Sequence, residues 1–221
     1  MENNLKNKIE EIKSLFVWPD KKPNIVPETN GWFTVASSNV LGMLIQHIDP
    51  KIICELGSWT GTGSTRFLLN AAPNAHLLCF DHWSPDVNDH GNGGTTVYED
   101  DDPELLQLPK IWDSFLFNSW EYQDRLTPVR AKTLEGLELT KPYNLPVDLV
   151  FIDADHSYEG TYNDIMKCAE LWPNSQITGD DFTWETVKAA VIDAAKALNK
   201  RVIFCHNCWF LTDQIAFEIN F

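Results

Sequence analysis

Two stretches in the second half of the chain carry closely spaced acidic residues. "FIDADH" contains Asp153, Asp155 and His156, and "ITGDD" ends in Asp180 and Asp181. If both stretches close neighbouring parallel strands, their carboxyl ends adjoin, and the carboxylates repel one another unless a cation or protons intervene. Hard oxygen ligands favour Mg²⁺, Mn²⁺ or Ca²⁺ over zinc. Either protons or a divalent cation of this kind would therefore be needed at this edge.

A glycine-rich turn follows an earlier apolar run in "KIICELGSWTGTGST". A dinucleotide fold requires G-x-G-x-x-G, but Trp59 stands where the second glycine would be. A phosphate-binding loop requires a lysine before its serine or threonine, and none precedes Ser64. The remaining pattern, Glu55-x-Gly57-x-x-x-Gly61, suits a ligand with a charged amino acid portion rather than a pyrophosphate.

The elements that must position these residues alternate between apolar runs and helical patterns, which is typical of a mostly parallel α/β sheet. We expect one domain over residues 1–221. The predicted strands are 51–55, 76–81, 126–130, 147–152, 175–179, 201–205 and 209–218. The predicted helices are 63–71, 111–121, 158–171 and 183–198, the last with Thr183 as its N-cap.

Two further segments flank this pattern. Residues 1–50 read as a helical cap: an amphipathic N-terminal helix, then "GWFTVASSNVLGMLIQHI" laid over the sheet or the site. Residues 82–125 form an insertion that ends in a helix, and their first part, 82–110, has little regular pattern. Because this part follows the second strand, it is placed as a lid over a ligand.

Composition excludes some partners. The chain has 17 basic and 32 acidic residues, a formal charge of -15, and no lysine or arginine between Arg66 and Lys110. Such a surface repels phosphate backbones, so we expect no nucleic-acid partner. The run "EDDDPE" reads as a solvated loop rather than a metal-binding tract.

Hydropathy and cysteines indicate the compartment. No apolar run approaches the roughly 18 residues that span a bilayer, and the N-terminus lacks a signal-peptide pattern. Five scattered cysteines suggest reduced thiols. We therefore expect a cytoplasmic protein that does not contact membranes. "CHNC" at 205–208 has metal-knuckle spacing but no second pair, and is more simply strand sequence.

"ELGSWTGTGST" resembles motif I of the class I S-adenosylmethionine (SAM) methyltransferases at Glu55, Gly57 and Gly61, although Gly63 departs from the commoner ending. Six blocks follow in order the layout of a metal-dependent O-methyltransferase-like group, distantly related to the catechol and macrocin enzymes: "GWFTVASSNVLGMLI", "ELGSWTGTGSTRFLL", "FDHW", "FLFNSWEYQDRLTPVRAKTLEGL", "VDLVFIDADHSYEGTYNDI" and "ITGDDFTWETVKAAV". The resemblance implies a Rossmann-like fold, a seven-stranded sheet of order 3-2-1-4-5-7-6 with helices on both faces.

The resemblance also implies how SAM is held. In the family the glycine turn packs on the methionine and ribose portions, and an acid ending the second strand, here Asp81, holds the ribose hydroxyls. Trp83 is placed to lie against the adenine or the acceptor. The residues implied in cofactor binding are Glu55, Gly57, Ser58, Trp59, Gly61, Ser64, Asp81, His82, Trp83 and Asp153.

For catalysis, the resemblance implies Asp153, Asp180 and Asp181 as ligands of a divalent cation, Mg²⁺ being expected. His156 occupies the position of a catalytic lysine in catechol-type enzymes and a histidine in macrocin-type enzymes, so it is the candidate general base, acting beside Asp153. A metal-bound hydroxyl has a lowered pKa, and a neutral imidazole takes its proton.

Simpler interpretations remain open for single residues. Asp155 and His156 would cap the turn before the next helix, and Asp180 would be the N-cap of the helix that follows it. Most tryptophans would belong to the core, while His82 and His90 would be solvated.

The function expected is SAM-dependent methylation of a hydroxyl on a small-molecule or sugar-containing acceptor. The acceptor would be contacted by residues 82–125 and by the segment around 31–33. Two alternatives are a metal-independent N-methyltransferase and a non-catalytic SAM- or nucleoside-binding protein, and fold alone does not separate them. Related enzymes often pair through N-terminal elements, so a homodimer is among the expectations.

Overall fold

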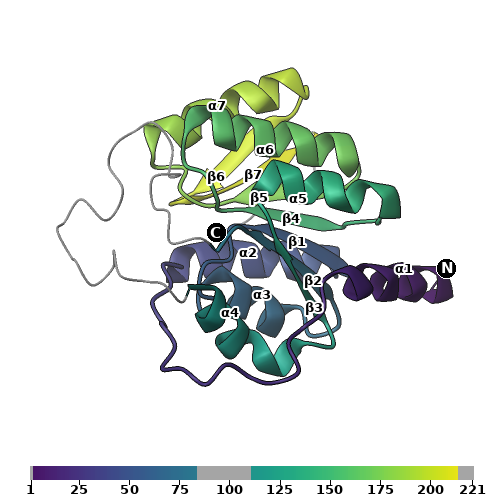
Figure 1. Cartoon of the computed structure of the whole chain (residues 1–221). Coiled ribbons are helices and arrows are strands. Elements are labelled where there is room, and N and C mark those ends of the chain that lie inside the picture. The colour runs from purple at the N-terminus through teal and green to yellow at the C-terminus, as the bar shows by residue number, and fades with distance from the viewer. Residues whose placement is uncertain (1, 84–110, 214–221) are drawn as a thin grey trace.

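The computed structural model describes residues 2–83 and 111–213. Seven strands form one sheet in the order β3-β2-β1-β4-β5-β7-β6, in which β7 runs antiparallel to both of its neighbours, β5 and β6 (Figure 1). This confirms the predicted topology. The strands are β1 (Ile52–Leu56), β2 (His76–Asp81), β3 (Leu126–Arg130), β4 (Leu149–Ile152), β5 (Gln176–Gly179), β6 (Arg201–Cys205) and β7 (Cys208–Thr212). Residues 214–218 of the strand predicted at 209–218 lie outside the described part.

Helices cover both faces of the sheet (Figure 1). The alternation of side chains along β1 shows why: Ile52, Cys54 and Leu56 belong to one core cluster, and Ile53 belongs to another. The first cluster includes residues of α5 (Thr133–Thr140), α6 (Tyr158–Leu171) and α7 (Glu185–Ala197). The second includes residues of α2 (Val35–Ile48), α3 (Ser64–Ala71) and α4 (Ile111–Ser119). Both faces of the central strands are therefore buried, as a parallel sheet requires.

The helix boundaries differ from the prediction in a few places. The N-terminal helix α1 spans Glu2–Leu15, and α2 begins at Val35 because Thr34 caps it, its side chain accepting the N–H of Ser37. The helix α5 was not predicted. The predicted helix 111–121 ends as α4 and continues in a 3₁₀ turn, η3 (Trp120–Tyr122). A second 3₁₀ turn, η4 (Lys141–Tyr143), follows α5.

The predicted N-cap of α7 was wrong. The cap is Trp184, without a side-chain hydrogen bond, because the Thr183 hydroxyl donates instead to the Asn207 amide oxygen at 2.5 Å. The "CHNC" stretch forms the turn of the hairpin between β6 and β7. Cys205 and Cys208 lie opposite each other in the backbone register of the two strands. None of the helices in the described part of the chain is both long and apolar enough to cross a membrane.

Candidate active site

The strand register brings the ends of four strands to one edge of the sheet. Leu56 at the end of β1 pairs with Phe80 of β2 and Ile152 of β4, and Ile152 pairs with Gly179 of β5. The residues that end or follow these strands therefore share this edge: Gly57, Asp81, Asp153, and the pair Asp180 and Asp181. In open parallel sheets this carboxyl edge is where ligands bind.

The glycine turn needs its glycines for two reasons. Gly57 has a φ of +83°, and a Cβ there would clash with the carbonyl of Asp153 at the end of β4. Gly61 has a φ of +77°, and a Cβ there would lie 2.8 Å from Ser119 Oγ. A side chain at Gly57 would force the turn away from the sheet edge, and a side chain at Gly61 would force it away from α4.

Asp81 shapes the same turn through its carboxylate. Its Oδ2 accepts the backbone N–H groups of Ser58 at 3.0 Å and Trp59 at 2.9 Å, and its Oδ1 accepts the N–H of Trp83 at 2.8 Å. Since each carboxylate oxygen has two acceptor positions, Oδ1 keeps capacity for one more donor. The predicted ribose acid therefore holds the turn and can still accept a hydroxyl.

Glu55 lies beneath the turn rather than in the crevice. Its side chain is fully buried, and Oε2 accepts the hydroxyls of Ser58 at 2.7 Å and Thr65 at 2.6 Å. Burial raises the pKa of Glu55 to about 7, although these hydrogen bonds act in the opposite direction. Glu55 thus fixes the turn from below and does not face a ligand in this conformation.

The remaining predicted cofactor residues occupy different environments. Trp83 is only 2% exposed. Its ring centroid lies 4.4 Å from that of the Phe115 ring, and its Nε1 donates to the Trp59 carbonyl at 2.7 Å. The ring is thus part of the core, and the structure does not bring it to a ligand. Ser64 is buried at the start of α3, whereas His82 is partly exposed. His90 lies outside the described residues.

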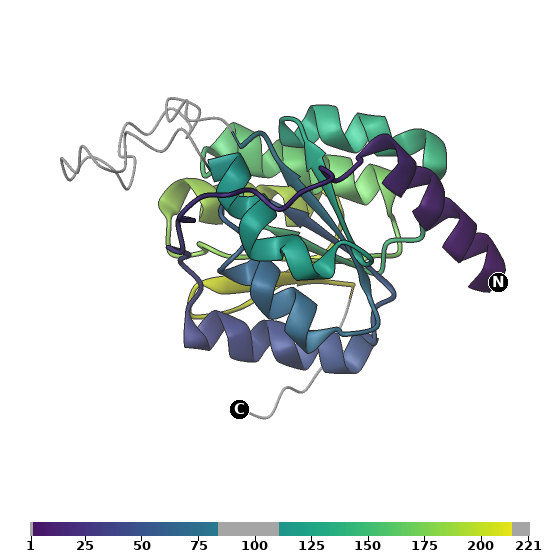
Figure 2. The same cartoon turned by 60° about the horizontal axis from the view of Figure 1, so that its bottom comes forward.

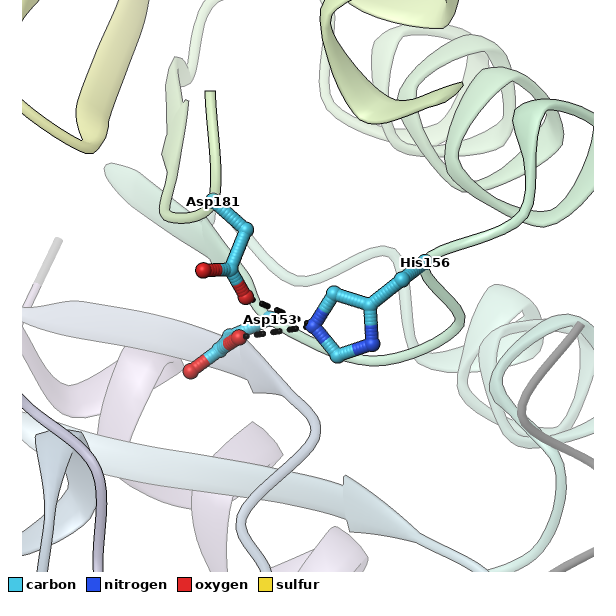
Figure 3. A group of neighbouring side chains, drawn as sticks. All are labelled: Asp153, His156 and Asp181. Atoms are coloured by element: carbon cyan, nitrogen blue, oxygen red, sulfur yellow. Dashed lines mark ion pairs between the residues drawn. The ribbon is translucent and has the colours of Figure 1, made fainter. Parts of the chain in front are cut away.

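Three side chains converge at the ends of β4 and β5, as Figure 3 shows. His156 Nε2 lies 2.7 Å from Asp181 Oδ2 and 3.5 Å from Asp153 Oδ1. One ligand atom from each residue lies within 4.8 Å of the others. The three side chains are each about one-fifth exposed, so the group is accessible from the crevice.

A positive charge between the carboxylates of Asp153 and Asp181 is electrostatically favourable. Burial acts to lower the pKa of His156, but hydrogen bonds and charges from Asp153 and Asp181 outweigh it and raise that pKa to about 10. Burial and the Asp181 charge raise the pKa of Asp153. The imidazolium of His156 thus stands where two acids would otherwise repel one another.

Asp180 points to a different partner. It is 5% exposed, and its Oδ1 accepts the Ser37 hydroxyl of α2 at 3.0 Å. Burial, followed by the charges of Asp153 and Asp181, raises its pKa to about 7. A cavity of about 10 Å³, lined by residues that include Asp153, His156 and Asp180, lies beside it. Space of this size accommodates one water or a small ion.

These observations bear on the predicted cation site. Oxygen donors from Asp153 and Asp181, with Asp180 across a small cavity, match the ligands that Mg²⁺ prefers. The donor set therefore fits a divalent cation, with His156 beside it. The predicted ligand set differs in one respect: Asp180 is not within the tight group, because Ser37 holds its carboxylate.

Sequence reasoning missed Asn207, which lies in the turn between β6 and β7. Its Nδ2 donates to Asp181 Oδ1 at 2.6 Å, and its backbone carbonyl accepts the N–H of Phe182 at 2.8 Å. Asp181 has a left-handed φ of +61°, which is uncommon for a residue with a side chain. Asn207 therefore holds Asp181 with the Asp181 carboxylate directed towards His156. The sequence offered one weak signal for Asn207, which is that it lies within "CHNC".

The sheet order, the glycine turn after β1 and the acid ending β2 define a Rossmann-like domain of class I methyltransferase type. Residues 54–182 match the family described as "Methyltransferase domain", which is more than half of the chain. The chain belongs to this methyltransferase family. The predicted enzyme class is confirmed.

Solved structures show the same fold. Cofactor-bound Rv0187 from MTB is 18% identical, with a TM-score of 0.55 over 96% of this chain and 91% of that one. The O-methyltransferase from Bacillus cereus in complex with SAH is 14% identical, with a TM-score of 0.56 over 95% of this chain and 89% of that one. The SAH-bound methyltransferase PaMTH1 of Podospora anserina is 13% identical, with a TM-score of 0.52 over 94% of this chain and 86% of that one. The search of curated proteins gave no match.

Proposed function

We propose that the protein transfers a methyl group from SAM to a hydroxyl of a small-molecule or sugar-containing acceptor, with help from a divalent cation, Mg²⁺ in the first instance. The observation that carries this proposal is the convergence of Asp153, His156 and Asp181 at the sheet edge that also carries the glycine turn. A base and a cation site beside a methyl-donor crevice serve oxygen better than an already nucleophilic amine.

The cofactor part rests on the turn between Gly57 and Gly61. Asp81 Oδ1 would accept a ribose hydroxyl with its remaining capacity, while Oδ2 keeps the turn closed through Ser58 and Trp59. SAM supplies an activated sulfonium methyl, so the protein has chiefly to align the acceptor in line with it.

The chemical part rests on the acidic group. Asp153 and Asp181 would hold the cation, with Asp180 across the cavity. A divalent cation bound there would lower the pKa of an acceptor hydroxyl and offset the carboxylate charges that now keep His156 protonated. His156 Nε2, directed into the group, would then take the hydroxyl proton.

The proposal extends to the cellular compartment, the charge of the acceptor and the oligomeric state. All five cysteines are free thiols, which agrees with the reducing cytoplasm. The charge of -15 favours a neutral or cationic acceptor over nucleic acid. A homodimer through the N-terminal elements stays an expectation.

Calorimetric titration with S-adenosylhomocysteine (SAH), with and without Mg²⁺, tests both parts. We expect the wild type to bind SAH, Asp81→Ala to lose SAH binding, and Asp153→Ala to lose Mg²⁺ binding. Absence of SAH binding to a folded wild type would overturn the SAM proposal. SAH binding without a response to Mg²⁺, Mn²⁺ or Ca²⁺ would remove the cation and leave a methyltransferase.

One observation favours a metal-independent enzyme as the second candidate. The protonated His156 already neutralises Asp181 at 2.7 Å, so the group is stable without another cation. Such an enzyme, acting on nitrogen, would keep its activity in Asp180→Ala and in the presence of a chelator. The metal-assisted enzyme would lose activity in both.

A further inference from the structure

The segment between α1 and α2, residues 16–34, crosses α4 and reaches the glycine turn (Figure 2). We call residues 28–33 of this segment the strap. The Thr60 hydroxyl donates to the Asn30 carbonyl at 2.9 Å, and the Thr62 hydroxyl donates to the Thr29 carbonyl at 3.0 Å. The strap is therefore bound along the turn that the proposed function assigns to SAM.

The strap backbone approaches the turn closely at one glycine. A Cβ added to Gly31 would lie 2.7 Å from the backbone nitrogen of Gly63 and 2.8 Å from Thr62 Oγ1. The two backbones therefore touch without room for a side chain. The position of the strap and the shape of the turn depend on each other.

Asn118 joins the two segments through a single side-chain amide. Its Nδ2 donates to the Glu28 carbonyl of the strap at 2.8 Å and to the Thr60 carbonyl of the turn at 2.9 Å. The backbone carbonyl of Asn118 accepts a hydrogen bond from the Arg66 guanidinium of α3. Asn118 is carried by α4, whose neighbouring residue Ser114 accepts the Glu28 N–H at 3.0 Å. A packed helix thus presents both N–H donors of one amide to two carbonyls.

The geometry points to Asn118 as a positioning residue for the cofactor turn. Thr60 is fully buried, so its carbonyl cannot exchange Asn118 for bulk water without opening the turn. With the amide present, the turn is held from above by the strap, from below by Glu55, and at its start by Asp81. A turn already held in one shape binds its ligand without the entropy cost of ordering.

The inference rests on the proposed use of SAM and is tested by SAH affinity of the apo protein. Asn118→Ala removes both donors, and we expect SAH to bind about tenfold or more weakly, as one lost buried hydrogen-bond partner implies. Asn118→Asp keeps the size of the side chain but sets a carboxylate against two carbonyls, so we expect at least the same loss. A side chain that only filled space would be replaced by Asp without a change in SAH affinity.

The matched control is Asn70→Ala, which removes an exposed asparagine of α3 away from the turn. We expect wild-type affinity for this control. Gly31→Ala is an independent variant that separates strap and turn by steric clash, and we expect it to weaken SAH binding while leaving Asn118 intact.

Each outcome separates the two proposals. If the wild type binds no SAH, the proposed function fails. If the wild type binds SAH and folded Asn118→Ala and Gly31→Ala bind it equally well, the positioning role fails while the methyltransferase stands. Should Asn118→Ala fail to fold, Gly31→Ala and Asn118→Asp decide the question, and wild-type affinity in whichever of them folds would overturn the inference.

Discussion

Buried carboxyl groups, above all Glu55 beneath the glycine turn, make the stability of this protein depend on pH. Burial raises the pKa of Glu55 from 4.5 to about 7, so between these values the folded protein keeps a proton that the unfolded chain has lost. The folded state is therefore destabilised as pH rises through this window, by roughly 3 kcal/mol for a shift of this size. Asp164, buried in α6, and Asp180, both raised to about 7, act in the same direction.

Glu55→Gln tests this prediction. The amide keeps an oxygen to accept the Ser58 and Thr65 hydroxyls but does not titrate. We expect the difference in unfolding free energy between pH 5 and pH 8, measured with urea, to be smaller in the variant by about 2 to 3 kcal/mol. An equal difference in wild type and variant would contradict the buried carboxyl as its source.

The residues of the candidate site were predictable to different degrees. Asp153 and His156 are three residues apart after a strand, so local spacing is enough to bring them together. The partners that orient the second acidic pair are not local: Ser37 lies 143 residues from Asp180, and Asn207 lies 26 residues from Asp181. Only the folded chain shows these contacts, because no periodicity records them.

At the scale of elements, the hairpin between β6 and β7 supports the loop between β5 and α7. Asn207→Ala would leave Asp181 Oδ1 and the Thr183 hydroxyl without their partner, and we expect a loss of about 1 to 3 kcal/mol in unfolding free energy. If Asp181 binds Mg²⁺, the same variant should weaken Mg²⁺ binding in calorimetry, because the left-handed Asp181 is no longer held.

The control for this prediction is Asn174→Ala, an exposed asparagine after α6. Asn207→Asp should not restore stability, since it replaces the donor with a second carboxylate beside Asp181. Wild-type stability in Asn207→Ala would mean that the loop keeps its shape without the hairpin.

The elements themselves were largely predictable, because alternating apolar runs and helical patterns leave few arrangements for a parallel sheet. The exception, α5, is eight residues long and contains Gly136, which weakens its helical signal. The glycine is needed for packing, because a Cβ there would lie 2.7 Å from the Phe80 ring. Tertiary contact therefore selects a residue that local propensity disfavours.

For the whole molecule, the charge of -15 is a destabilising term that salt can reduce. The Debye length falls from about 30 Å to about 10 Å between roughly 0.01 and 0.1 M salt, so distant carboxylates cease to repel one another. We expect the melting temperature to rise over this range. The same rise in NaCl and KCl would assign it to screening, and a fall in both would contradict it.

The position of β7 has a consequence for how the protein is made. This strand lies between β5 and β6, although it follows both in the sequence. In the described sheet β6 pairs with β7 alone, so during translation β6 leaves the ribosome before the strand that attaches it. Asn207 emerges with the same hairpin. The loop that carries Asp180 and Asp181 is thus synthesised before the residue that fixes it, and the nascent chain can complete the candidate site only when β7 has been inserted.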